Sequence, residues 1–173
     1  AAREARFAFL RVHARTLYDR LTDNRRKFRR VEWLAYQAPS LVPGLVPTAA
    51  EVAAEAELRQ SEKDGCEIDQ GILFNQFFAD PDCGQHLCHA MLLPREESAE
   101  ALAKFRRDGR LDLGFAKVER QGKAAVLLLS NRRFLNAEDE TTVDAVETAV
   151  DLAILDPESE IAVLRGDVVE HSK

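Results

Sequence analysis

The chain has 173 residues, which is enough for one domain of ordinary size or two small ones. Its hydrophobic fraction of 46% and charged fraction of 31% are typical of a soluble globular protein, and no run of about 18 apolar residues predicts a membrane span. Charged residues begin at Arg3, so we expect no signal peptide, and the three cysteines form no disulfide framework. These features predict a cytoplasmic protein with no membrane partner.

The charge is distributed unevenly along the chain. The formal net charge is −6, but residues 1–34 contain ten Arg or Lys and only four Asp or Glu. This segment could form a basic surface for an acidic partner, or a helix that packs on the acidic remainder of the protein. We favour the second reading and expect no nucleic-acid partner, because no recognisable binding motif or ladder of aromatic residues accompanies the charge.

The first part of the chain has the periodicity of helices. Apolar residues recur at intervals of three and four from Ala1 to Tyr36, until "QAPSLVPGLVPT" ends the pattern with three prolines. Thr48 and Glu51 form a capping box, which predicts a helix through about Lys63. Further helices are expected at Glu67–Ala79, Pro81–Leu93 and Glu97–Arg107.

After residue 110 the period changes to that of strands. "FAKVER" alternates, "AAVLLLS" is continuously apolar, and "QGK" joins them as a hairpin turn. A helix is expected at Glu138–Leu155, followed by a buried strand in "IAVLRG". Strand, helix and strand in this order predict a parallel crossover. We therefore predict an α+α/β chain with a helical domain over residues 1–110 and the start of an α/β domain over residues 111–173.

This α/β region looks incomplete. One hairpin, one helix and one further strand bury too little surface for a parallel sheet, and the strand at Ile161–Arg165 would form an open apolar edge. We expect the chain to be the N-terminal portion of a longer polypeptide, whose remainder covers this region.

Two clusters invite a functional reading, but each has a simpler explanation. The set of Cys66, Cys83, His86, Cys88 and His89 lacks the paired spacing of a zinc site, so we expect buried cysteines and surface histidines, with no metal. The run "RRKFRR" is expected to be a solvated or partner-packing face. The sequence contains no glycine-rich phosphate loop and no nucleophile-elbow or zinc-protease motif.

The segment "SNRRFLNAEDE" (residues 130–140) has both a structural and a functional reading. In the structural one, Asn136 is a helix N-cap with Asp139 three residues later, and the acids suit the positive end of the helix. Arg132 and Arg133 could pair with those acids. This reading leaves the joint occurrence of Arg132 and Glu138 unexplained.

The same segment resembles the opening of the crotonase, or enoyl-CoA hydratase/isomerase, superfamily. "VERQGKAAVLLLSNRRFLNAEDE" follows the superfamily's hairpin, and "NRRFLNAE" matches its N-R-P-x-x-x-N-A-L segment at Asn131, Arg132, Asn136 and Ala137. Arg133 stands in place of the usual proline. Glu138 and the long helical region before the hairpin are similar to the (3,5-dihydroxyphenyl)acetyl-CoA 1,2-dioxygenase family of glycopeptide-antibiotic biosynthesis.

The resemblance implies a role for several residues of this segment. Arg132 would pair with a phosphate of CoA, because its planar guanidinium matches phosphate oxygens. Glu138 would accept hydrogen bonds from the hydroxyls of the dihydroxyphenyl ring. The residues expected to line the substrate or CoA channel are His171, Ser172 and Lys173 and, with weaker support, Arg133, Leu135 and Ala137. No catalytic residue is expected in this segment, because the oxyanion-hole amides would follow Lys173.

The resemblance also implies a reaction. The substrate would be an aryl-acetyl-CoA with O₂ as co-substrate and no metal, flavin or other cofactor, and the enzyme would be a trimer or hexamer of identical subunits. Two alternatives stay open. The protein could be an ordinary crotonase-type hydratase, isomerase or thioester hydrolase, or a non-enzymatic helical interaction module.

Overall fold

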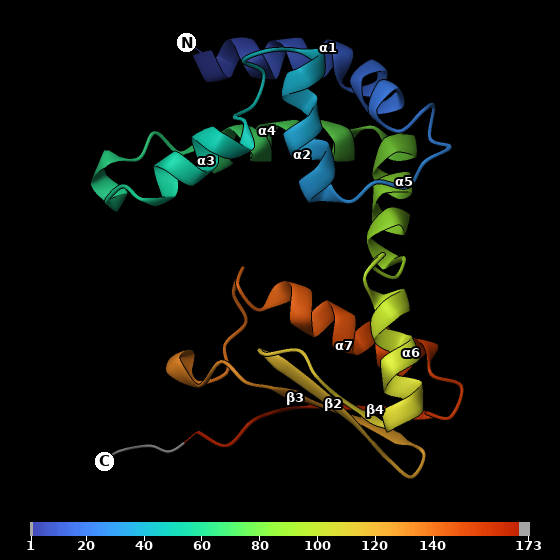
Figure 1. Cartoon of the computed structure of the whole chain (residues 1–173). Coiled ribbons are helices and arrows are strands. Elements are labelled where there is room, and N and C mark those ends of the chain that lie inside the picture. Colours follow the sequence, from blue (N-terminus) through green and yellow to red (C-terminus); the bar gives the residue numbers. More distant parts are fainter. Residues whose placement is uncertain (1, 170–173) are drawn as a thin grey trace. The chain divides into compact units, whose positions relative to one another are not determined.

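The computed structural model describes residues 2–169 and separates the chain into two compact units, divided between Leu93 and Pro94. Figure 1 shows a helical first unit and a second unit built on a small sheet. The division falls earlier than the predicted boundary near residue 110. Helix α6 (Ser98–Asp108) belongs to the second unit because it packs against α7 and β1, whose bounds follow below.

The first unit is made of helices, as predicted. Their bounds are α1 Ala2–Leu21, α2 Val31–Leu41, α3 Ala49–Ala56, the 3-10 turn η1 Gln60–Glu62, α4 Cys66–Ala79 and α5 Pro81–Leu92. Helix α1 packs against α2 and α4, and α4 also contacts α3 and α5. The predicted capping box is present, with the Thr48 and Glu51 side chains bonded to each other's backbone N–H groups. The helix that it starts ends at Ala56, earlier than predicted.

The prediction of continuous helix from Ala1 to Tyr36 was wrong, because the chain turns between α1 and α2. Asp23, Asn24 and Arg25 have φ angles of 53°, 55° and 62°, in the left-handed region that ends a right-handed helix. Thr22 Oγ1 stabilises the turn by donating to the Tyr18 carbonyl (2.7 Å) and accepting from Arg25 N (3.1 Å). Leu21 and Phe28, on either side of the turn, are seven residues apart and would share one face of a continuous helix, so their spacing does not reveal it. The polar run Thr22–Lys27 between them is the signal that was available.

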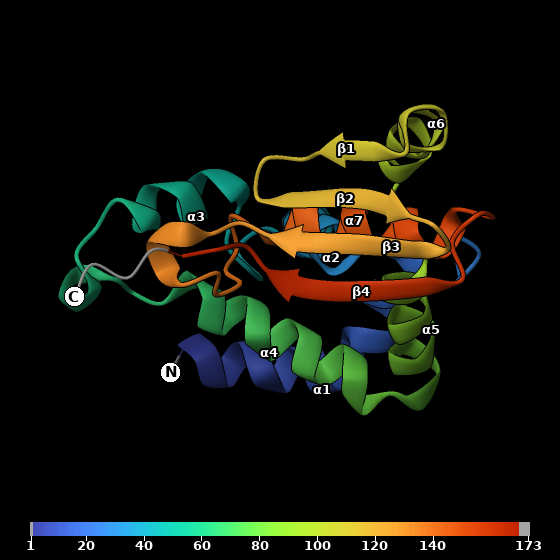
Figure 2. The ribbon, with the colours of Figure 1, turned by 90° about the horizontal axis from the view of Figure 1, so that it is seen from below.

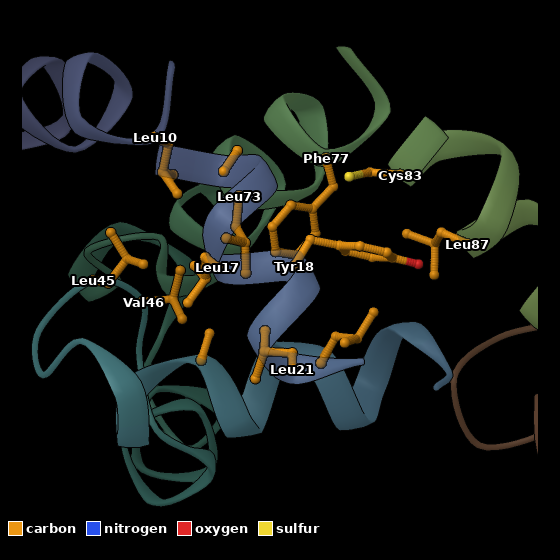
Figure 3. Packing of buried hydrophobic residues seen from close by; sticks show 13 residues of the cluster. Leu10, Leu17, Tyr18, Leu21, Leu45, Val46, Leu73, Phe77, Cys83 and Leu87 are labelled. Atoms are coloured by element: carbon orange, nitrogen blue, oxygen red, sulfur yellow. The ribbon is translucent and has the colours of Figure 1, made fainter. Parts of the chain in front are cut away.

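Tyr18 lies in the middle of the first unit's core (Figure 3). Its ring meets Phe77 edge-on, with centroids 5.0 Å apart and planes at 70°, and its hydroxyl lies 2.8 Å from His86 Nδ1. This arrangement buries the large ring and still satisfies its polar end. The buried cluster consists of Leu10, Ala14, Leu17, Tyr18, Leu21, Leu34, Ala38, Leu45, Val46, Leu73, Phe77, Cys83 and Leu87.

The second unit is a four-stranded mixed sheet with helices on one face (Figures 1 and 2). Its other elements are β1 Arg110–Asp112, β2 Ala116–Gln121, β3 Ala124–Leu129, the 3-10 turn η2 Arg132–Phe134, α7 Val143–Leu155 and β4 Ile161–Gly166. The strand order is β1-β2-β3-β4. Strands β2 and β3 form the predicted hairpin, and β4 pairs in parallel with β3 after the predicted crossover through α7. Strand β1 is only three residues long and was not predicted.

The core of the second unit lies between the sheet and helices α6 and α7. The cluster consists of Phe105, Ala116, Val118, Ala125, Leu127, Ala149, Leu152 and Ala153. Within residues 2–169 all six residues of β4 are exposed and the strand pairs only with β3, so it forms the open apolar edge that the sequence predicts. Burial of this strand by further residues of the polypeptide stays a prediction.

The start of α6 is held by a side chain from α7 rather than by its own N-cap. Asp151 Oδ2 accepts hydrogen bonds from Arg95 N (2.9 Å) and from the buried Ser98 Oγ (2.6 Å). Glu97, the N-cap residue, makes no capping bond with its own side chain. This carboxylate satisfies one donor just before α6 and one on its first residue, and so joins the start of α6 to α7.

Within residues 2–169, no helix is both long enough and apolar enough to cross a membrane.

Candidate functional site

The candidate site is the loop that leaves the carboxyl end of β3, together with the residue that leaves the carboxyl end of β4. Because the two strands are parallel and Leu129 pairs with Gly166, residues 130 and 167 emerge side by side. Asp167 N also donates to the Leu129 carbonyl (2.7 Å). In α/β folds the carboxyl ends of parallel strands are where ligands bind.

The loop folds back on Asn131, a residue that is 6% exposed. The Asn131 carbonyl accepts from Phe134 N (3.0 Å) and Asn136 N (2.8 Å), and its Nδ2 donates to the Ala137 carbonyl (2.9 Å). Leu135 and Asn136 have φ angles of 56° and 60°, which turn the chain tightly. The loop is therefore a defined structure with its own network of hydrogen bonds.

Arg132 and Asp167 form an ion pair across the two strand ends. Asp167 Oδ2 accepts from Arg132 Nη2 (2.8 Å) and Nε (3.2 Å), and from Ser130 Oγ (3.1 Å). The Arg132 side chain is 64% exposed, whereas that of Asp167 is 17% exposed. Hydrogen bonds from Arg132, from Val168 N and from Ser130 lower the pKa of the Asp167 carboxyl to about 2.

The predicted N-cap role of Asn136 was wrong. Helix α7 begins at Val143, seven residues later, and Asn136 Nδ2 instead donates to the Asp167 carbonyl (2.7 Å). An Asn in the left-handed region ends a turn here rather than starting a helix. The helix predicted over Glu138–Leu155 therefore begins five residues later than expected, at Val143.

Asp139 organises the segment between the loop and α7. Its carboxylate accepts from Thr141 N (2.9 Å), Thr141 Oγ1 (2.6 Å) and Asn131 Nδ2 (3.1 Å). Although partial burial opposes ionisation, the bond from Thr141 outweighs it and holds the pKa of the Asp139 carboxyl below its usual value. Asp139 thus stabilises the turn before α7, whereas its neighbour Glu138 is exposed to solvent.

The structure brings five of the predicted site residues together in one loop. Arg132, Arg133, Leu135, Ala137 and Glu138 all lie between the end of β3 and the start of α7, and all are exposed. The Arg133 guanidinium carbon lies 5.2 Å from the centre of the Phe134 ring. The remaining predicted residues, His171, Ser172 and Lys173, lie outside the described residues. The ligand roles of all eight stay predictions.

The sequence reasoning missed Asp167 and Ser130. A signal was available, because a parallel crossover places the first residue after each strand at the same edge of the sheet. The first acid after "IAVLRG" could therefore have been paired with the polar residues after "AAVLLL".

The cysteines and histidines of the first unit are dispersed rather than clustered. Cys83 lies in the core, Cys88 is exposed, and His86 contacts Tyr18 and stacks on Phe28 with ring centroids 4.7 Å apart. Among residues 2–169, no group of three or more His, Cys, Asp or Glu side chains is arranged to hold a metal ion. That finding concerns this part of the chain only, and the absence of a cofactor stays a prediction.

Comparisons with known proteins bear on the whole chain. A scan against models of known protein families gave no match. A search of curated proteins found a protein of Amycolatopsis orientalis named "(3,5-dihydroxyphenyl)acetyl-CoA 1,2-dioxygenase", which is 45% identical over 171 residues. The match covers 99% of this chain and 39% of that protein, so the chain spans about two fifths of its relative's length. The resemblance to the (3,5-dihydroxyphenyl)acetyl-CoA 1,2-dioxygenase family predicted from the sequence is therefore confirmed, over almost the whole of this chain and part of the relative.

Proposed function

We propose that this chain is part of an oxidoreductase that converts (3,5-dihydroxyphenyl)acetyl-CoA and O₂ into 3,5-dihydroxyphenylglyoxylate and CoA. The observation that carries the proposal is the 45% identity over 99% of the chain to the dioxygenase of Amycolatopsis orientalis. The match includes the loop after β3, where five of the predicted ligand-binding residues lie. The family would place the reaction in the synthesis of dihydroxyphenylglycine for glycopeptide antibiotics.

The chemistry starts with removal of a proton from the carbon next to the thioester carbonyl. Backbone N–H groups of an oxyanion hole stabilise the resulting enolate, and each such donor contributes roughly 3–4 kcal/mol in enzymes where it has been removed. O₂ then adds to that carbon. The overall reaction balances when one oxygen atom becomes the keto oxygen and the other enters the carboxylate. Of the two protons lost from the α carbon, one ends on the thiol of the departing CoA and the other is released to solvent.

Arg132 is proposed to bind a phosphate of CoA. Its guanidinium is exposed while Asp167 holds it from the protein side, which fixes its direction before a ligand arrives. Glu138 is proposed to accept hydrogen bonds from the phenol hydroxyls, for which its exposed carboxylate is suited. Leu135, Ala137 and Arg133 would line the pantetheine and adenine end, and His171, Ser172 and Lys173 the channel entry.

The wider assembly follows from the same family. We propose that the mixed sheet of the second unit is the start of a crotonase-like fold, completed by further residues of the same polypeptide. The enzyme would work in the cytoplasm as a trimer or hexamer, with O₂ reacting directly with the substrate enolate and without metal or flavin.

Oxygen uptake by the complete protein with (3,5-dihydroxyphenyl)acetyl-CoA tests the proposal. We expect uptake that a metal chelator does not reduce, and mass spectrometry of the product formed under ¹⁸O₂ should find label in the carboxylate. Hydration of an enoyl-CoA without oxygen uptake would instead establish an ordinary crotonase. Binding of a protein partner with neither activity would favour an interaction module.

Arg132→Ala tests the phosphate contact. We expect KM for the CoA substrate to rise more than kcat falls, because the lost contact is present in both ground and transition states. An unchanged KM would remove Arg132 from the binding site.

A further inference from the structure

We propose that Asp167 is a positioning residue that fastens the Ser130–Ala137 loop to the end of β4. The link from this loop to an acyl-CoA rests on the proposed function, but the fastening itself does not. Asp167 contacts both ends of the loop, with its side chain on one end and its backbone on the other, and these contacts can be tested separately.

The side chain of Asp167 holds the beginning of the loop. One oxygen, Oδ2, accepts from Ser130 Oγ and from two nitrogens of Arg132, at 2.8–3.2 Å. The other, Oδ1, accepts from Val168 N at 2.8 Å, which fixes the orientation of the carboxylate. Charge-assisted bonds of this kind are roughly twice as strong as neutral ones.

The backbone carbonyl of Asp167 holds the end of the loop by accepting from Asn136 Nδ2 (2.7 Å). Its N–H donates to the Leu129 carbonyl (2.7 Å) and so continues the pairing of β4 with β3. Asn136 lies so close to the strand that a Cβ on Gly166 would come within 2.9 Å of Asn136 Nδ2. The loop therefore rests directly on the backbone of residues 166 and 167.

The geometry points to an indirect role for Asp167. A carboxylate repels a phosphate, and the Asp167 side chain is 17% exposed against 64% for Arg132. Arg132 is thus the side chain that a ligand would contact, and Asp167 sets the orientation of the Arg132 guanidinium. Removing the carboxylate would leave the arginine in place but free its side chain to take other conformations, so that affinity falls through lost preorganisation.

Two variants of the complete protein separate the contacts. Asp167→Asn removes the charge and keeps the backbone bonds. Asn136→Gly removes the bond to the Asp167 carbonyl and tolerates the φ of 60°. Glu160→Gln is the matched control, because Glu160 is an exposed acid paired with Lys123 just before the start of β4, away from the loop.

The first readout is amide hydrogen exchange, which requires no substrate. In both variants we expect exchange at residues 134–137 to become about tenfold faster or more, as the loss of one well-formed hydrogen bond allows. Exchange in β2 and β3 should not change, and the control should match the parent everywhere. Unchanged exchange in the loop of both variants would overturn the fastening.

The second readout is the affinity for CoA, measured by calorimetry, and KM for the acyl-CoA. We expect Asp167→Asn to weaken both about tenfold while kcat changes less than threefold. Faster exchange with unchanged CoA affinity would overturn the positioning role while leaving the fastening intact. If the parent protein neither binds CoA nor consumes oxygen, the proposed function fails, and the exchange result still decides whether Asp167 holds the loop.

Discussion

Arg120 and Asp156 join the middle of the sheet to the end of α7 through two parallel hydrogen bonds. Arg120 Nε donates to Asp156 Oδ2 and Nη2 to Oδ1, each at 2.9 Å, and the Asp156 side chain is fully buried. Burial opposes ionisation of this carboxyl, but the bonds from Arg120 and Ser159 outweigh it, so its pKa lies below the usual value. The pair fixes α7 against β2, on which the crossover to β4 depends.

Asp156→Ala is expected to lower the free energy of unfolding by about 2–3 kcal/mol. Removing one member of a buried ion pair leaves the other without its main partner, and Glu158, which lies 2.8 Å from Arg120 Nη1, compensates only in part. Urea denaturation of the complete protein measures the change. Glu100→Gln, which breaks an exposed pair with Lys104, should leave the unfolding midpoint where it is. Equal effects of the two variants would refute the structural role of Asp156.

Arg132→Gln is expected to raise the pKa of the Asp167 carboxyl from about 2 toward its ordinary value, because the bond from Arg132 contributes most to lowering it. A carboxyl with a lowered pKa stabilises the fold above its unfolded-state pKa of about 3.9, and this contribution is lost as the pH falls through about 2. The loop contact should therefore be intact at neutral pH. Carbon-detected NMR titration of the Asp167 carboxyl measures the shift, and a midpoint that does not move would contradict the ion pair.

Cys83 and Cys88 are expected to react with thiol reagents at very different rates. Burial raises the pKa of the Cys83 thiol to about 12, and its side chain is closed to solvent, whereas Cys88 is exposed. Thiolates are the reactive form, so native protein treated with iodoacetamide at pH 8 should be modified at Cys88 and not at Cys83. Peptide mass spectrometry identifies the sites, and unfolding in urea should make Cys83 reactive. Equal labelling in the native state would show that the core is open at this point.

Glu138→Gln is expected to slow turnover several-fold with little change in the unfolding midpoint. Glu138 is exposed and lies before the start of α7, so we expect the loss of its charge to leave the fold intact. Steady-state oxygen uptake measures the effect. Glu140→Gln, at an exposed acid two residues later, is the control and should keep full turnover. Full activity of the Glu138 variant would mean that this carboxylate does not contact the substrate.

The regular elements could be predicted where local pattern and tertiary packing agree. The helix expected over Glu67–Ala79 is α4 to within one residue, and the hairpin and the parallel crossover are as expected. The break after Thr22 is not evident from apolar spacing, because Leu21 and Phe28 on either side of it are placed as on one face of a helix; the polar run between them is the signal that was available. Strand β1 is only three residues long, too short for its alternation to predict a strand, and its place in the sheet comes from pairing with β2.

The candidate site could be predicted in position but not in detail. Residues 132–138 were singled out from the sequence, and the structure places them at the carboxyl end of β3. The contacts of Asn136 and Arg132 with Asp167 span 31 and 35 residues of sequence, and no local pattern encodes them. On spacing alone, Asn136 was explained equally well as a helix N-cap. Only the parallel register of β3 and β4 decides between that role and its contact with Asp167.

Asp151 binds the start of α6 although it lies far along the sequence in α7. This contact affects how the second unit folds. Arg95 and Ser98 receive their partner from a segment more than fifty residues later, so the start of α6 lacks that partner until α7 has docked. During synthesis on a ribosome the N-terminal part of the chain emerges first. The start of α6 would therefore be exposed before Asp151 is available to bind it. The two helices should then gain their protection from solvent in a single kinetic step, because the bonds from Arg95 and Ser98 to Asp151 form only when both helices are docked.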